Sequence, residues 1–210
     1  IQGAAVVVTK EIPVGPELLS QFPESVKLIV EAGTGYNNID LDAARAKGIT
    51  VCNIPAYSTE RVAHTAIMML LNFASTMQQQ IGMLARGDRS NFTKHLQVPH
   101  TEVNGKTLGI IGAGHIGMAV VKVARALDMN ILIHTRTPKE DSEGIRYVSL
   151  DELLAQSDYI SLHCPLNDKT KHLINKDTIA KMKSNAVIIN TGRGALINEA
   201  DLCDALAAKR

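Results

Sequence analysis

The residues with the clearest chemical potential are three glycines in the segment GAGHIG, residues 112–117. This G-x-G-x-x-G pattern follows an expected strand over 107–111 and opens an expected helix. Gly112 permits a tight turn, Gly114 lets a phosphate approach the backbone, and Gly117 lets the helix pack closely on the sheet. Free N–H groups and the helix dipole would then meet a diphosphate. The pattern predicts a dinucleotide-binding turn; a purely structural glycine turn is the alternative.

The end of the next expected strand indicates which dinucleotide would bind. NAD-binding versions of this turn normally carry an Asp or Glu there, which accepts hydrogen bonds from the adenosine ribose. This chain instead has Thr135, Arg136 and Thr137. Arg136 can give a 2′-phosphate a charge-assisted hydrogen bond, and a threonine hydroxyl can add another. We therefore predict NADP(H) rather than NAD(H); alternatively, Arg136 faces solvent and other contacts hold NAD.

Short apolar strands alternate with helical stretches along the chain, which predicts parallel sheets covered on both faces. We expect an α/β fold of two doubly wound parallel-sheet domains, residues 1–86 and 101–210, joined through a polar loop. The strands are expected at 4–8, 26–30, 49–53, 107–111, 130–134, 146–149, 159–163 and 186–190. The helices are expected at 41–47, 59–84, 116–127, 150–156, 176–182 and 199–209.

The stretch 59–84 reads as one long helix that links the two domains. It contains no proline, and only Gly82 interrupts a run of good helix formers. Its methionines are typical of core or subunit-interface positions rather than of a cofactor site. These methionines are Met68, Met69, Met77 and Met83.

Composition and charge exclude several classes of protein. The 210 residues are 45% apolar and 20% charged, as in a soluble globular protein, and the net charge of +1 recruits neither nucleic acid nor membrane. No apolar run could cross a bilayer. Cys52, Cys164 and Cys203 lack metal-site spacing, so we expect no metal and a cytoplasmic location with reduced thiols. The chain begins without Met or a signal-peptide pattern, which suggests a fragment.

Four segments together resemble the D-isomer-specific 2-hydroxyacid dehydrogenases. The resemblance implies a flavodoxin-like substrate domain and an NAD(P)-binding Rossmann domain, both incomplete in this chain. The segments are EAGTGYNNID at 31–40, NGKTLGIIGAGHIG at 104–117, LHCPL at 162–166 and NTGRGALINE at 190–199.

The resemblance also implies cofactor contacts for particular residues. The backbone at His115 and Ile116 takes the position that meets the pyrophosphate. Cys164 and Pro165 match the loop that passes over the cofactor ribose, with Thr170 in the following turn. The segment Thr191-Gly192-Arg193 matches the nicotinamide end of the site.

The substrate site follows from the same resemblance. The backbone of Gly33-Thr34-Gly35 matches the loop that holds the substrate carboxylate, and Arg193 matches the catalytic arginine. A fixed guanidinium can hold the carboxylate of a 2-keto acid and polarise the adjacent carbonyl as hydride arrives. The alternative for Arg193 is a structural ion pair.

Two departures from the family pattern concern the remaining machinery. Family members read Val-Ala-Glu-x-Thr where this chain has VAHTA at 62–66, so His64 replaces the acid and is interpreted as a helix-packing residue. The role of Thr65 stays open. The family's proton-donating His and its Glu partner lie downstream of the segment around Arg193, and we expect both beyond Arg210.

These expectations combine into one function. We expect an NAD(P)-dependent oxidoreductase that transfers a hydride between the nicotinamide and a small D-2-hydroxyacid or 2-keto acid of the glyoxylate or hydroxypyruvate type. The resemblance implies a homodimer, with the methionine-rich helix at the interface. The alternative is a dinucleotide-sensing, corepressor-like binding protein of the same fold. A formate dehydrogenase relative is disfavoured because no dedicated small-anion signature is present.

Overall fold

The computed structural model describes residues 1–208, which belong to two compact units: Ile1–Ser58 and a second unit that begins at Thr59. The first unit is a three-stranded parallel sheet in the order β1-β2-β3 with two short helices. Its elements are β1 (Val6–Thr9), α1 (Pro16–Ser20), β2 (Leu28–Glu31), α2 (Leu41–Ala46) and β3 (Thr50–Cys52).

The two helices of the first unit pack on one face of its sheet. Alternation along the strands directs Val7, Ile29 and Val51 into a shared apolar cluster with residues of α1 and α2. Just after α2, the Lys47 ammonium donates hydrogen bonds of 2.8, 3.0 and 2.8 Å to three carbonyl oxygens at and beyond the end of α1. These carbonyls belong to Leu19, Ser20 and Phe22. One lysine therefore supplies additional hydrogen-bond donors to carbonyls around the end of the short helix.

The second unit contains a five-stranded parallel sheet in the order β6-β5-β4-β7-β8. This is the order of five of the six strands of a Rossmann sheet, with its reversal between β4 and β7. Open sheets of this kind bind their ligands at the carboxyl ends of the strands beside such a reversal. The strands are β4 (Thr107–Ile111), β5 (Asn130–His134), β6 (Ile145–Tyr147), β7 (Tyr159–Leu162) and β8 (Val187–Asn190).

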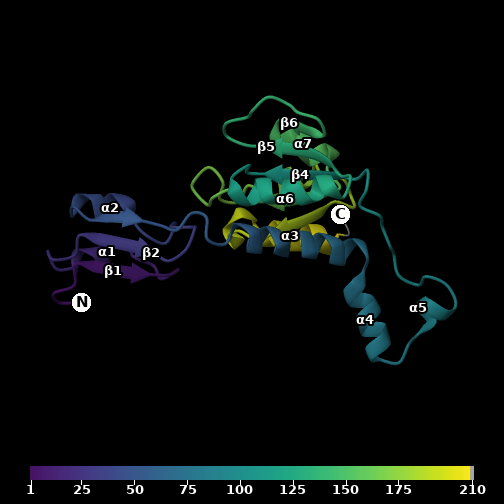
Figure 1. Ribbon diagram of the computed structural model, residues 1–210, viewed down its shortest axis with the longest axis horizontal. Helices are drawn as coiled ribbons and strands as arrows, with labels where there is room; N and C mark the ends of the chain where they lie inside the picture. The colour runs from purple at the N-terminus through teal and green to yellow at the C-terminus, as the bar shows by residue number, and fades with distance from the viewer. Residues whose placement is uncertain (209–210) are drawn as a thin grey trace. The chain divides into compact units, whose positions relative to one another are not determined.

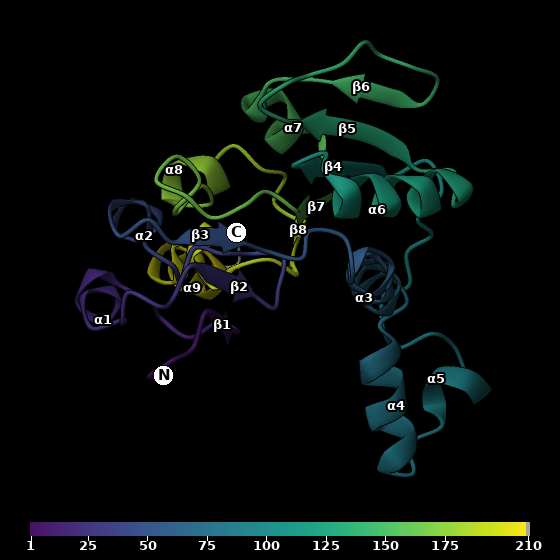
Figure 2. The same cartoon turned by 60° about the vertical axis from the view of Figure 1, so that its left-hand side comes forward.

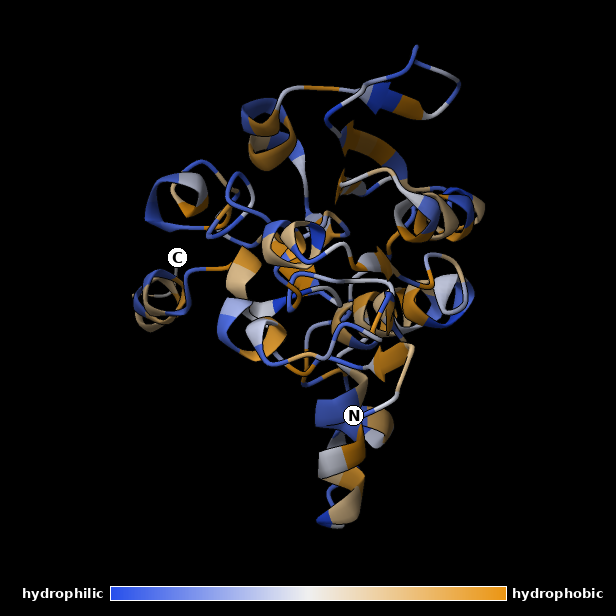
Figure 3. Ribbon diagram, turned by 90° about the vertical axis from the view of Figure 1, so that its left-hand side faces the viewer, coloured by the Kyte–Doolittle hydropathy of each residue, from blue (hydrophilic) through white to orange (hydrophobic). Residues whose placement is uncertain are grey.

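Helices cover both faces of this sheet. On one face, α3 (Thr59–Ala74) and α6 (His115–Ala126) pack side by side (Figure 1), in a cluster that includes buried residues of all five strands. On the other face, α7 (Leu150–Gln156) buries Leu153 and Leu154 against β5 and β7. The helices carry both hydrophobic and hydrophilic residues, as amphipathic covering layers should (Figure 3). The chain continues through α8 (Lys176–Ile179), the 3₁₀ turn Gly194–Leu196 and α9 (Glu199–Ala207).

The prediction of one helix over 59–84 is wrong. The helix α3 ends at Ala74, and α4 (Met77–Ala85) continues in a different direction (Figure 2). The break lies at Thr76, whose left-handed φ of 48° cannot continue a helix. Its hydroxyl donates a 2.7 Å hydrogen bond to the Pro99 carbonyl, which a helix pattern cannot reveal because the partner is 23 residues away. A further short helix, α5 (Ser90–Thr93), lies in the segment expected to be loop.

The compact units divide between Ser58 and Thr59, not in the expected loop near residues 87–105. The reason is that α3 packs on α6 and β8, so it belongs with the second sheet. Every expected strand is present, with its ends shifted by no more than two residues. Among the described helices, none is long and apolar enough to cross a membrane.

Candidate functional site

Two of the three glycines in the turn after β4 are required by the packing of the chain itself. Gly112 has φ +101°, and a Cβ there would lie 2.6 Å from the Cys164 nitrogen and 2.7 Å from the His163 carbonyl carbon. A Cβ on Gly117 would collide with the Gly112 carbonyl oxygen. Because these neighbours are backbone atoms, neither clash can be relieved by a side-chain movement.

Gly114 differs from both. Its φ of −78° and ψ of −167° suit any residue, it is exposed, and a Cβ there would meet no atom within 4 Å. It is the N-cap of α6 and offers no side chain to the N–H groups of the first turn, which starts at His115. The fold therefore leaves open space beside unsatisfied donors, as a bound phosphate would require.

The end of β5 lies next to this turn. The Gly112 N–H donates a 2.9 Å hydrogen bond to the His134 carbonyl, and the His134 ring Nδ1 is 3.2 Å from the Val148 carbonyl oxygen. His134 is thus engaged in the fold. Beyond it, Thr135 is half-buried and Arg136 is exposed. These two side chains lie where the strand of a dinucleotide-binding fold meets the adenosine ribose.

The loop after β7 lies against the glycine turn. The His163 N–H bonds to the Ile111 carbonyl at 2.8 Å, and its ring Nε2 lies 2.8 Å from the Ser161 hydroxyl oxygen. Burial lowers the pKa of His163 to about 4, so the imidazole is neutral near neutral pH. Burial raises the pKa of the adjacent Cys164 thiol, which therefore stays protonated.

The hydroxyl of Thr170 closes this loop. It donates a 2.6 Å hydrogen bond to the Pro165 carbonyl and accepts one of 2.9 Å from the Asn167 N–H. Its single proton is therefore used within the loop. Thr170 holds the segment that begins at Cys164 and Pro165 in place against the turn at Gly112.

A third loop, after β8, carries Arg193. The Asn190 side chain shapes it: Oδ1 accepts a 3.0 Å hydrogen bond from the Gly192 N–H, and Nδ2 donates one of 3.0 Å to the Arg193 carbonyl. Sequence reasoning missed this role, although an Asn at a strand end before a Gly-rich segment is a recognisable turn signal. Thr191 Oγ1 is buried and has no hydrogen-bond partner among the described residues.

Strand register brings the three loops to one edge. Ile111 pairs with Leu162, which in turn pairs with Asn190, so β4, β7 and β8 end level with one another. The resulting edge offers open backbone donors at α6, a buried orphan hydroxyl at Thr191 and one arginine. Among residues 1–208, no group of His, Cys, Asp and Glu side chains could hold a metal ion. These features fit a dinucleotide.

The Gly33-Thr34-Gly35 loop belongs to the first unit and follows β2. The Ile54 N–H donates to the Gly33 carbonyl at 3.0 Å, and the Thr34 hydroxyl donates to the Ile54 carbonyl at 3.2 Å. The Asn53 amide adds a 2.8 Å hydrogen bond to the Thr34 carbonyl. The loop is therefore held from the β3 side by one backbone and two side-chain hydrogen bonds.

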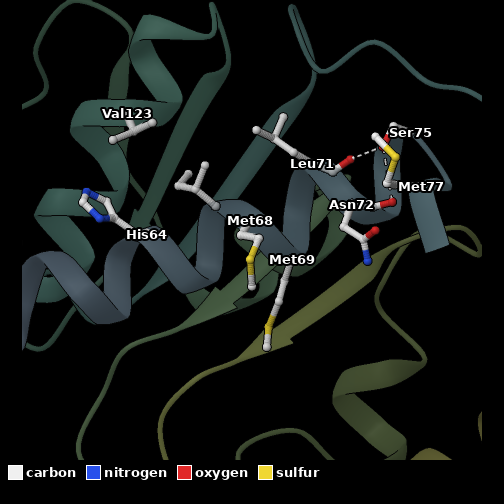
Figure 4. Close-up of a pocket in the computed structure, with 9 residues that line it drawn as sticks. His64, Met68, Met69, Leu71, Asn72, Ser75, Met77 and Val123 are labelled. Atoms are coloured by element: carbon white, nitrogen blue, oxygen red, sulfur yellow. Dashed lines mark hydrogen bonds between the residues drawn. The ribbon is translucent and has the colours of Figure 1, made fainter. Parts of the chain in front are cut away.

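An apolar groove of about 610 Å³ lies elsewhere, along the outer surface of α3 (Figure 4). Met68, Met69 and Leu71 line it together with Val123 of α6. His64 lies at one end and is exposed, with its ring on the same helix surface. The groove contains none of the expected cofactor residues, so it is a separate feature of the second unit.

The second unit matches a known family of sequences. Residues 67–210 fit the family model described as D-isomer specific 2-hydroxyacid dehydrogenase, NAD binding domain. A hydroxypyruvate reductase of Blautia hydrogenotrophica is 40% identical to this chain over 210 residues, which cover 98% of this chain. The chain spans 65% of the length of that relative.

Solved structures show the same similarity. The chain resembles a glyoxylate reductase from Paecilomyes thermophila with a TM-score of 0.89 and 39% identity, covering 98% of this chain and 64% of that one. It also resembles a D-lactate dehydrogenase from Aquifex aeolicus, complexed with NAD and lactic acid, with a TM-score of 0.92 and 36% identity. That alignment covers 98% of this chain and 62% of the other.

Proposed function

We infer the function from one premise: the chain belongs to the D-isomer-specific 2-hydroxyacid dehydrogenase family. We propose that the natural full-length protein is an oxidoreductase that reduces a small 2-keto acid, of the glyoxylate or hydroxypyruvate type, to the D-2-hydroxyacid. The bound nicotinamide cofactor supplies the hydride. Residues of this chain bind, orient and polarise the reactants.

The observation that carries the proposal is the contrast among the three glycines of the turn. Packing explains Gly112 and Gly117, but nothing within the second unit requires a glycine at residue 114. A ligand that approaches the backbone closely does explain it. We therefore assign the pyrophosphate to the N–H groups at His115 and Ile116, and the ribose and nicotinamide portions to the loops after β7 and β8.

Arg193 is proposed as the catalytic residue of this chain. It follows the carboxyl end of β8, where open parallel sheets bind their ligands, and Asn190 fixes its backbone. A guanidinium at this position can stabilise the alkoxide that develops from the keto group. We propose that the backbone of Gly33, Thr34 and Gly35 binds the substrate carboxylate.

For the cofactor, we propose a preference for NADP(H). Arg136 is exposed at the end of β5, and a 2′-phosphate there would gain a charge-assisted hydrogen bond from it and one from Thr135. Arg136→Ala should weaken NADPH binding by about 10- to 100-fold, the worth of one such bond, and leave NADH binding within about twofold. Lys139→Ala, which removes a nearby exposed charge, is the matched control. Equal effects on both cofactors would contradict the preference.

The decisive experiment combines direct titration of the full-length protein with NADH and NADPH and steady-state assays with a panel of 2-keto acids. Saturable binding of either cofactor together with turnover of glyoxylate, hydroxypyruvate or pyruvate supports the proposal. Binding without turnover across the panel would favour the alternative of a dinucleotide-sensing binding protein. Failure to bind either cofactor would refute both.

We also propose a homodimer formed through α3, α4 and the segment after them. This part of the second unit exposes large apolar side chains, which cost free energy in water and are typical of a subunit interface. Sedimentation of the full-length protein should give twice the chain mass, and Ile81→Glu should shift it toward the monomer. The exposed apolar residues are Met68, Met69, Phe73, Met77, Ile81, Leu84, Phe92 and Leu96.

A further inference from the structure

A fully buried carboxylate lies directly beneath the loop that we assign to the substrate. Glu31 ends β2 and is 0% exposed. Its Oε1 accepts a 3.0 Å hydrogen bond from the Glu11 N–H, and its Oε2 accepts one of 2.8 Å from Asn38 Nδ2. The same Asn38 amide donates a 3.0 Å hydrogen bond to the Ile12 carbonyl. One side chain therefore joins the loop after β1 to the far end of the loop after β2.

The position of Glu31 in the sheet explains how it reaches both loops. Strand alternation places it on the face of Ile29, and register places it beside Thr9 of β1. The carboxyl group thus lies on the same face as the apolar cluster, at the carboxyl edge of the sheet. Within the described chain, Glu31 takes part in no ion pair, so two neutral donors alone compensate its burial.

The carboxyl group also limits the space under the loop. A Cβ on Gly33 would lie 3.3 Å from Glu31 Oε1, and Gly33 itself is buried. The loop is therefore anchored at its beginning by the contacts of Gly33 and Thr34 with Ile54, and at its end by the Glu31–Asn38 hydrogen bond. The backbone N–H groups between these anchors are the ones assigned to the substrate carboxylate.

We propose that Glu31 is a positioning residue for the substrate-binding loop over 33–38. It acts through Asn38 and Gly33 and does not touch the substrate. This inference rests on the proposed function, because Glu31 is taken to fix the positions of the backbone N–H groups that bind the substrate carboxylate. Backbone donors must be held to within a fraction of an ångström for such a site to work, and a displacement near 1 Å can cost about 100-fold in rate.

The test is a polarity exchange at the Glu31–Asn38 hydrogen bond in the full-length protein. In Glu31→Gln, an amide N–H group at residue 31 would face the amide donor of Asn38. In Asn38→Asp, two carboxylates would face each other. Each single variant should therefore raise KM for the 2-keto acid about tenfold. Cofactor Kd should stay within about twofold. The double variant sets an amide donor at residue 31 opposite a carboxylate acceptor at residue 38 and should bring KM back toward the wild-type value, except for the part that depends on the Asn38–Ile12 hydrogen bond. Glu24→Gln, at an exposed glutamate of the same unit, should change nothing.

Hydrogen exchange supplies a readout that does not depend on activity. Amides over 33–38 should exchange faster in both single variants and slow again in the double variant. If the wild type neither binds cofactor nor turns over, the proposed function fails, and the exchange result still decides whether Glu31 holds the loop. If the wild type is active but the single variants keep wild-type KM and exchange, the positioning role is overturned. A drop in melting temperature with unchanged KM would also overturn it, because that pattern describes a structural role only.

Discussion

Gly114→Ala should separate ligand binding from folding. The backbone at residue 114 already has φ and ψ values that alanine adopts, and the added methyl meets no atom of the chain within 4 Å. Alanine costs up to about 1 kcal/mol at an N-cap position. It also restricts the unfolded chain, which returns roughly 0.4–1 kcal/mol. The free energy of unfolding should therefore change by less than about 1 kcal/mol.

Binding should respond very differently. A methyl group in the path of the pyrophosphate separates it from the N–H groups at the start of α6, so dinucleotide affinity should fall by at least about 100-fold, or ~2.7 kcal/mol. Thermal unfolding and fluorescence titration with NADH and NADPH measure the two effects on the same sample. The reasoning is refuted if the alanine variant folds normally and binds with wild-type affinity.

Gly112→Ala is the informative comparison. Its φ of +101° would strain an alanine by roughly 1–3 kcal/mol, and the Cβ would press on backbone atoms of His163 and Cys164. This variant should lose several kcal/mol of stability before any effect on the cofactor can be measured. Equal stability of the two variants would show that the turn is less tightly packed than the structure implies.

Two further outcomes concern His163 and Lys47. The pKa of His163 is about 4 in the folded protein against 6.5 when unfolded, so the unfolded state binds the extra proton between these values. Stability should be level above pH 6.5 and fall by about 3 kcal/mol as pH drops to 4, and His163→Gln should lack that component in urea titrations at several pH values. Lys47→Met removes donors to three carbonyls around α1 and should cost about 1–3 kcal/mol, with faster hydrogen exchange over residues 16–22. Unchanged exchange there would contradict this role for the lysine.

Local sequence pattern predicted the sheet of the second unit well. The strands β4 and β5 have the bounds that the sequence predicted, because strands buried on both faces are short, largely apolar runs such as TLGII and NILIH. The glycine turn was equally predictable, because the G-x-G-x-x-G spacing lies between an expected strand and an expected helix. The turn residues Gly112 and Gly117 are explained by the packing that their pattern predicts.

Features that depend on distant partners could not be predicted. The break at Thr76 depends on a hydrogen bond to Pro99, and the boundary at Ser58 depends on the packing of α3 against α6. The importance of Glu31 likewise arises from a hydrogen bond to the Glu11 N–H, a group 20 residues away that becomes a neighbour only after folding. Periodicity reports which face of an element is buried, but not what covers it.

The interlocked turn and the exposed strand end have different tolerance to redesign. Gly112, Gly117 and the backbone at Cys164 share one steric constraint, so a change at any of them disturbs the packing of the turn against the loop after β7. Arg136 and Thr137, just beyond the end of β5, are exposed and carry no such constraint. Engineering of nucleotide preference can therefore be confined to a few surface positions, and libraries built there should retain folded protein in most members.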